Sequence, residues 1–189
     1  MTVIDGKTNA TATVTVGNYP VAVAVNSSTH MVYVANDLSG NVTVINGITN
    51  ATSTVSTAAY PDAVGINSQT NKIYVGSAGN PGSVTVIDGN TNATTTLSVG
   101  AQENVVVDQL RNKVYVTNLA GVTVIDGKTN ATYTAPLYDE TFALAENVLT
   151  NQLYVLDLAN DSVNLFSGAA GATPVPFLNE LMIAPSDLR

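Results

Sequence analysis

Three acidic residues stand where successive segments of the chain enter runs of residues typical of β-strands: Asp62, Glu103 and Glu140, with Asn104 beside the second. If these segments surround a common axis, their carboxylate and amide oxygens could converge on it, and oxygen-rich sites of this kind bind Ca²⁺ or Mg²⁺. The alternative interpretation is a solvated rim that holds no cofactor, and we expect the carboxylates to be scattered.

Other catalytic chemistry has few residues to draw on. The chain has one histidine and no cysteine, which excludes disulfides, thiolate metal sites and cysteine nucleophiles. The residues that correspond to His30 in later segments are Asn71, Asn112 and Asn151, all in predicted turns. We therefore expect His30 to be a surface turn residue, because a hairpin tip is a poor place to hold a catalytic base against a nucleophile.

Two groups of tyrosines differ in their setting. Tyr19 and Tyr60 each precede a proline in a predicted loop, and they are candidates for an exposed ligand contact. Four others recur once per segment, at Tyr33, Tyr74, Tyr115 and Tyr154. A residue that recurs so regularly is expected to pack adjacent sheets together, with its hydroxyl bonded at the edge.

These segments are internal repeats. The phrase Asp/Asn-Gly-x-Thr-Asn-Ala-Thr occurs four times, and its glycines, Gly6, Gly47, Gly89 and Gly127, are 41, 42 and 38 residues apart. The chain between them is rich in Val, Thr, Ile and Tyr, which favours short strands. Asp or Asn before Gly is a strong hairpin signal, and Gly is expected to supply a positive φ there. Four antiparallel strands every 40 residues or so predict an all-β β-propeller.

Each repeat divides into four predicted strands, the innermost first. These are 21–26, 31–35, 41–46 and 52–57 in one repeat, 62–67, 72–76, 83–88 and 94–99 in the next, 103–108, 113–117 and 121–126 in the third, and 142–147, 152–156 and 162–166 in the fourth.

The motifs also carry a family resemblance. Tyr-Val-Ala-Asn at Tyr33 and Tyr-Val-Thr-Asn at Tyr115, each followed by Val-Thr-Val-Ile-(Asp/Asn)-Gly-x-Thr-Asn, resemble the YVTN-type β-propeller repeat over roughly residues 1–168. The resemblance implies a prokaryotic surface-layer or binding protein, outside the cell or in its envelope, related to lactonase-like propellers. Lactonase-like propellers use a metal held by such residues to polarise an ester carbonyl and activate water, and the resemblance implies this role for Asp62, Glu103 and Glu140.

The predicted single domain holds about four and a half repeats. We expect a half blade at 1–17, blades at about 18–58, 59–100, 101–136 and 137–178, and a tail at 179–189, with one more strand near 173–178. Relatives implied by the resemblance usually close a ring of seven, which needs roughly 280 residues at this period. Three alternatives stay open: a closed ring of four or five blades, an open arc that pairs with a second copy, or a fragment.

Composition restricts the partners. Charged residues make up 11% of the chain, and the net charge is −8. No basic run is present, so nucleic acid and anionic membranes are not expected as partners. No apolar stretch is long enough for insertion into a membrane, and the chain shows no signal peptide. The sequence therefore favours a non-catalytic, extracellular or cell-surface module that binds protein, glycan or another copy of itself through its blade edges, with the metal-dependent hydrolase or lyase as the alternative.

Overall fold

The computed structural model describes residues 1–100, 102–136, 141–157 and 161–167, and these form an all-β structure with one short 3-10 turn, η1 (Asp37–Ser39). Within these ranges, seventeen strands form five antiparallel sheets. The first sheet is a hairpin of β1 (Thr2–Ile4) and β2 (Thr11–Thr13). The second sheet contains β3 (Pro20–Asn26), β4 (Met31–Asn36), β5 (Asn41–Asn46) and β6 (Thr52–Ser56).

The other three sheets repeat this pattern. The third contains β7 (Pro61–Asn67), β8 (Lys72–Ser77), β9 (Ser83–Asp88) and β10 (Thr94–Ser98). The fourth contains β11 (Gln102–Asp108), β12 (Lys113–Asn118), β13 (Gly121–Asp126) and β14 (Thr132–Pro136). The fifth contains β15 (Thr141–Asn147), β16 (Gln152–Asp157) and β17 (Ser162–Ser167).

The predicted strands are confirmed. Strands β5, β9 and β13 have the predicted bounds, and the other strands that the structure describes differ at their ends by one residue in most cases. The predicted strand near 173–178 and the tail at 179–189 lie outside the described residues, as do 137–140 of the fourth predicted blade.

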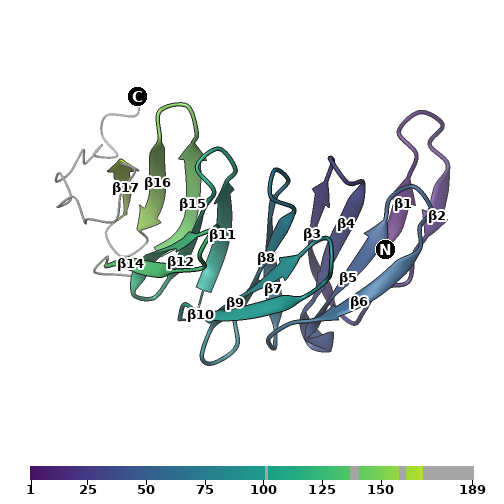
Figure 1. Cartoon of the computed structure of the whole chain (residues 1–189), viewed down its shortest axis with the longest axis horizontal. Helices are drawn as coiled ribbons and strands as arrows, with labels where there is room; N and C mark the ends of the chain where they lie inside the picture. Colours follow the sequence, from purple (N-terminus) through teal and green to yellow (C-terminus); the bar gives the residue numbers. More distant parts are fainter. Residues whose placement is uncertain (101, 137–140, 158–160, 168–189) are drawn as a thin grey trace.

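The sheets stand in an open row (Figure 1), with β1–β2 at one end and β15–β17 at the other. The inner strands β3, β7, β11 and β15 lie side by side along this row. The described residues form an open arrangement, so they do not form the closed ring of four or five blades that was one of the three alternatives.

The hairpin between the third and fourth strands of each repeat departs from the prediction in one respect. The positive φ belongs to the asparagine of the phrase, Asn50 for example at 60°, and not to the glycine. The side chain of the Asp or Asn that begins the phrase accepts hydrogen bonds from the backbone amides two and three residues later at 2.8 to 3.2 Å, as Asp126 does from Lys128 and Thr129 at 3.0 and 2.9 Å. This local bonding stabilises the turn.

The glycine instead permits a close approach between two turns. The amide of Gly47 donates to the His30 carbonyl at 2.8 Å, and a Cβ built on Gly47 would lie 2.8 Å from that oxygen. Because real Cβ atoms essentially never come so close, a side chain there would force the turns apart.

The core lies between neighbouring sheets. Tyr33 packs among residues of the second and third sheets, Tyr74 among those of the third and fourth, and Tyr115 among those of the fourth and fifth. The packing role predicted for these tyrosines is confirmed, since their exposed fractions are 0%, 0% and 7%. The prediction for their hydroxyls is wrong for Tyr33 and Tyr74, whose buried oxygens have no hydrogen-bond partner among the described residues.

Candidate functional site

The loops that enter the inner strands carry the two predicted contact tyrosines. Tyr19 and Tyr60 are 63% and 53% exposed, and their φ angles are 55° and 58°. A positive φ is unusual for a bulky residue. Here it lets each carbonyl accept a bond across the loop, from the Asp37 amide at 2.9 Å and from the Ala78 amide at 3.0 Å. Both rings are therefore held on the surface by fixed backbone.

The predicted metal ligands are only partly described. Asp62 on β7 and Asn104 on β11 are partly buried. Glu103 lies on β11, but its side chain is outside the described residues, and Glu140 is outside them altogether. Over the part of the chain that the structure describes, no three His, Asp or Glu side chains gather closely enough to hold a metal ion. The convergence of the three acids stays a prediction.

A more regular polar feature joins the sheets at the opposite end of the inner strands. The last residue of β3, Asn26, donates through Nδ2 to Asn71 Oδ1 of the next sheet at 2.8 Å. Asn67, the last residue of β7, does the same to Asn112 at 2.9 Å. The Oδ1 atom of each donor caps its own turn, as when Asn67 accepts from Gln69 and Thr70. We call these contacts the amide joints.

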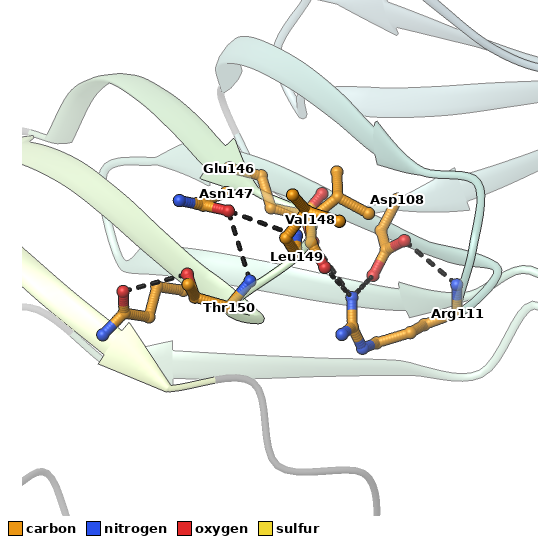
Figure 2. Close-up of polar contacts among 8 residues, drawn as sticks. Asp108, Arg111, Glu146, Asn147, Val148, Leu149 and Thr150 are labelled. Carbon is orange, nitrogen blue, oxygen red and sulfur yellow. Dashed lines mark hydrogen bonds and ion pairs between the residues drawn. The ribbon is translucent and has the colours of Figure 1, made fainter.

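The contact between the fourth and fifth sheets is built differently, as Figure 2 shows. The last residue of β11 is Asp108, whose ionised carboxylate has no proton to donate. Asn151, which corresponds to Asn71 and Asn112, has a buried Oδ1 with no partner among the described residues. Instead, Arg111 Nη1 bonds to Asp108 Oδ2 at 3.1 Å and to the Val148 carbonyl of the next sheet at 3.0 Å, and it lies 3.9 Å from Glu146 Oε1.

Three substitutions in register create this carboxylate joint. Asp108 replaces the asparagine of the other inner strands, Arg111 replaces a threonine of the other turns, and Glu146 occupies the place of Val25, Ile66 and Val107. The Asp108 side chain is fully buried and that of Glu146 is 4% exposed. Two buried carboxyl groups therefore lie beside one guanidinium, whose side chain is 26% exposed.

The two carboxyl groups titrate in opposite directions. Burial first, and then the neighbouring Asp108 carboxylate, raise the pKa of Glu146 to about 7 against the opposing effect of the Arg111 charge. The pKa of Asp108 is lowered, because hydrogen bonds from the Arg111 amide and guanidinium outweigh its burial. Pairs of carboxyl groups with separated pKa values are typical of acid–base sites. Burial closes this pair to a substrate, so its chemistry is proton binding within a joint.

Both end sheets expose apolar side chains at positions that are buried or partly buried in the middle sheets. Tyr154 is 39% exposed, and Leu165, Leu156 and Val163 on the same face are 39%, 41% and 49% exposed. At the other end, Val23 and Val25 of β3 are each 60% exposed. The equivalents of Val23 and Val25 in β7, Val64 and Ile66, pack against the core that contains Tyr33.

A hollow accompanies the face on β3. A pocket of about 500 Å³ opens between the β1–β2 hairpin and β3–β4, lined by Val3, Val25, His30 and Val32 among others. His30 is exposed and has a φ of 58°, close to the 52° and 53° of Asn71 and Asn112. The predicted turn role of His30 is confirmed.

Sequence reasoning missed the carboxylate joint. The departure at Glu146 is visible in the sequence, since a glutamate interrupts the valine pattern of an inner strand. What the sequence does not show is that Asp108 and Arg111, on a neighbouring sheet, face that glutamate.

Solved structures place the fold among β-propellers. The chain is similar to Kuenenia stuttgartiensis hydrazine synthase (TM-score 0.62, 17% identity, 87% of this chain and 53% of that one). It is also similar to the RRP9 WD40 repeats (TM-score 0.63, 10% identity, 80% and 52%) and to U3-55K (TM-score 0.60, 11% identity, 80% and 53%). WD40 repeats form propellers, so the chain has a β-propeller fold and spans about half the length of these structures.

The other comparisons found nothing. No family model matches the chain, and no curated protein matches it. Within the described residues no helix is long and apolar enough to cross a bilayer.

Proposed function

We propose that the chain is a non-catalytic interaction scaffold, an extracellular or cell-surface propeller module of the YVTN type, whose partners include a second copy of itself. The observation that carries the proposal is the exposure of the two end faces. Tyr154, Leu156 and Leu165 form one face and Val23 and Val25 the other, at positions that are buried or partly buried in the middle sheets. Exposed apolar patches of this kind mark interaction sites.

The two faces are complementary, because they correspond to the two sides of a contact between neighbouring sheets. Inside the chain, a tyrosine face packs against the inner strand of the next sheet, as Tyr74 packs with Val105 and Val107. Tyr154 of one copy against Val23 and Val25 of another would repeat that contact. A head-to-tail interface of this type is heterologous.

A polar contact supports the same arrangement. Asn147 ends β15 as Asn26 and Asn67 end β3 and β7, and its Oδ1 caps its own turn through the amides of Leu149 and Thr150. Its Nδ2 is thus oriented by the same turn as the donors of the amide joints. In the second copy, the residue at the acceptor position is His30, whose neutral ring has one acceptor nitrogen.

The β1–β2 hairpin restricts this contact. Val14 beside β2 already packs with Val34 and Ile45, so the hairpin covers the outer part of the β3–β6 face. Strands β15 and β16 of the incoming copy would contact the inner part of this face, and its β17 would compete with β1 for the outer part. We therefore expect weak association that depends on concentration.

Sedimentation velocity over a range of chain concentrations tests the proposal. Wild type is expected to associate, and Val23→Asp and Leu165→Asp, each with one damaged face, are expected to be monomeric alone. Their mixture should form a dimer, because each variant keeps the face that the other lacks. Leu119→Asp, at a 63% exposed loop residue of the fourth sheet, away from both end faces, is the matched control. A monomeric wild type at every concentration, or a mixture that stays monomeric, would contradict self-association.

Two features support the wider binding role. The exposed tyrosines of the loops, Tyr19 and Tyr60, offer aromatic contacts to a protein or glycan. The low charged fraction of 11% suits a surface of hydroxyl and amide groups outside the cell. The hydrolase alternative stays a prediction, which calorimetric titration with calcium chloride can test.

A further inference from the structure

The carboxylate joint differs from the amide joints in a way that depends on protons. In the amide joints every group is neutral, and a direct hydrogen bond of 2.8 or 2.9 Å crosses between the sheets. In the carboxylate joint the corresponding acceptor, Asn151 Oδ1, has no partner among the described residues, and Glu146 Oε1 and Oε2 have no hydrogen-bond donor there either. Buried polar atoms without partners are costly and call for an explanation.

One proton on Glu146 supplies the missing donor. Protonated Glu146 can donate its O–H to the Asp108 carboxylate, while Asp108 keeps its bonds from Arg111 at 3.0 and 3.1 Å. A hydrogen bond to an ionised acceptor is stronger than one between neutral groups. With both carboxyl groups ionised, two negative charges face each other in a buried site, and the single guanidinium lies 3.9 Å from Glu146.

We propose that the contact between the β11–β14 sheet and the β15–β17 sheet is a pH-dependent clasp, which holds when Asp108 and Glu146 share one proton and loosens when both are ionised. The loosened state frees the end sheet that carries Tyr154. The proposal does not depend on self-association.

The charged and titratable groups around Glu146 are few. Asp108 faces it from β11, Arg111 from the turn after β11, and Tyr115 from β12. The pKa of Tyr115 is raised to about 12, by burial first and then by the charges of Glu146 and Asp108, so its phenol stays neutral through the range considered. Arginine keeps its charge at any pH that the fold survives.

The direction of the pH effect follows from the two shifts. The pKa of Glu146 rises from 4.5 to about 7 on folding, so its contribution is fully present below 4.5 and is lost as pH rises through 7. The pKa of Asp108 falls below 3.8, so its contribution is present above 3.8 and is lost as pH falls further. The clasp is therefore strongest in mildly acidic solution and weakens toward alkaline pH.

Hydrogen exchange of the backbone amides tests the clasp. Protection in β15 and β16 is compared at about pH 5.5 and about pH 8, after correction for intrinsic exchange rates, with β7 and β8 as the internal reference. We expect protection in β15 and β16 to fall at least about tenfold more than in the reference, because one unit of pKa shift corresponds to a tenfold change in an equilibrium. An equal change in both pairs of strands would overturn the proposal.

Two variants distinguish the effect of the Glu146 proton from a general effect of pH on folding. Glu146→Gln has a permanent donor for Asp108, so its protection should be high and equal at both pH values. Asp108→Asn restores the amide donor for Asn151 Oδ1 and removes the charge that, after burial, raises the pKa of Glu146, so it should weaken the pH dependence by a second route. If either folded variant keeps the pH dependence of the wild type, the clasp is not the cause; Asp108→Asn decides the matter if Glu146→Gln does not fold.

Discussion

The third and fifth sheets are built from the same repeat, yet they are held in different ways. The third buries Tyr74 completely and is joined to its neighbours by amide joints on both sides. The fifth exposes 39% of Tyr154 and is joined to its neighbour by the carboxylate joint. One repeat can thus serve as a rigid interior unit or as an end unit, depending on a few substitutions at the joint and on what covers its tyrosine face.

The largest expected effect comes from truncation of these two tyrosines. Tyr74→Ala removes a fully buried ring and should lower the free energy of unfolding by about 3–5 kcal/mol. Tyr154→Ala should lower it by about 1 kcal/mol, because much of that ring is already in water. Urea unfolding measures both. Tyr74→Phe is the control and should be nearly neutral, since the hydroxyl has no partner among the described residues; equal losses for the two alanine variants would remove the distinction between interior and end sheets.

A smaller effect should follow when an amide joint is converted to the other type. Asn67→Asp keeps the oxygen that caps the turn through Gln69 and Thr70 but loses the donor to Asn112. It leaves a buried acceptor without a partner and should cost about 1–3 kcal/mol at neutral pH. Thermal unfolding at neutral pH measures the loss. Ser68→Ala, which removes the exposed contact to Gln109 across the same two sheets, is the control and should cost less; a neutral Asn67→Asp would mean that the amide joints do not hold the sheets.

The smallest effect concerns an ion pair within one sheet. Lys113 Nζ lies 2.6 Å from Asp126 Oδ2, and each side chain is 34% exposed. The hydrogen bond from Lys113 holds the pKa of Asp126 well below 3.8, so the pair contributes above that pH and is lost as the carboxylate is protonated. Lys113→Met should cost no more than about 1 kcal/mol at neutral pH. The difference from wild type, measured by urea unfolding, should shrink in high salt and below about pH 3; a loss that persists under both conditions would point to packing of the lysine stem instead.

Local and periodic features of the fold were predictable from the sequence. The recurring hairpin phrase and the Tyr-Val motif place strands such as β5 and β9 because turn chemistry and alternation act within a few residues. The role of the hairpin glycines was mispredicted because it depends on a tertiary contact. Gly47 is needed because the turn at His30 approaches it, and the hairpin sequence alone does not show that contact.

The site was less predictable than the fold. The exposure of Tyr19 and Tyr60 follows from their place in loops beside proline. The carboxylate joint needs Asp108, Arg111 and Glu146 from two sheets, and a single sequence does not reveal which side chains meet across an interface. The exposed state of Tyr154, whose three counterparts are buried, depends on what lies beyond its sheet and not on its own motif.

Disulfide trapping would test the central claim, that the two end faces bind each other, most directly. Because the chain has no cysteine, Val23→Cys and Tyr154→Cys can be made separately, mixed and oxidised under mild conditions, with Leu119→Cys, at an exposed loop residue of the fourth sheet, as the partner in the control mixtures. The account predicts that the Val23→Cys and Tyr154→Cys pair forms covalent dimers much faster than either control mixture. Dimer formation at the same rate in all mixtures would contradict it.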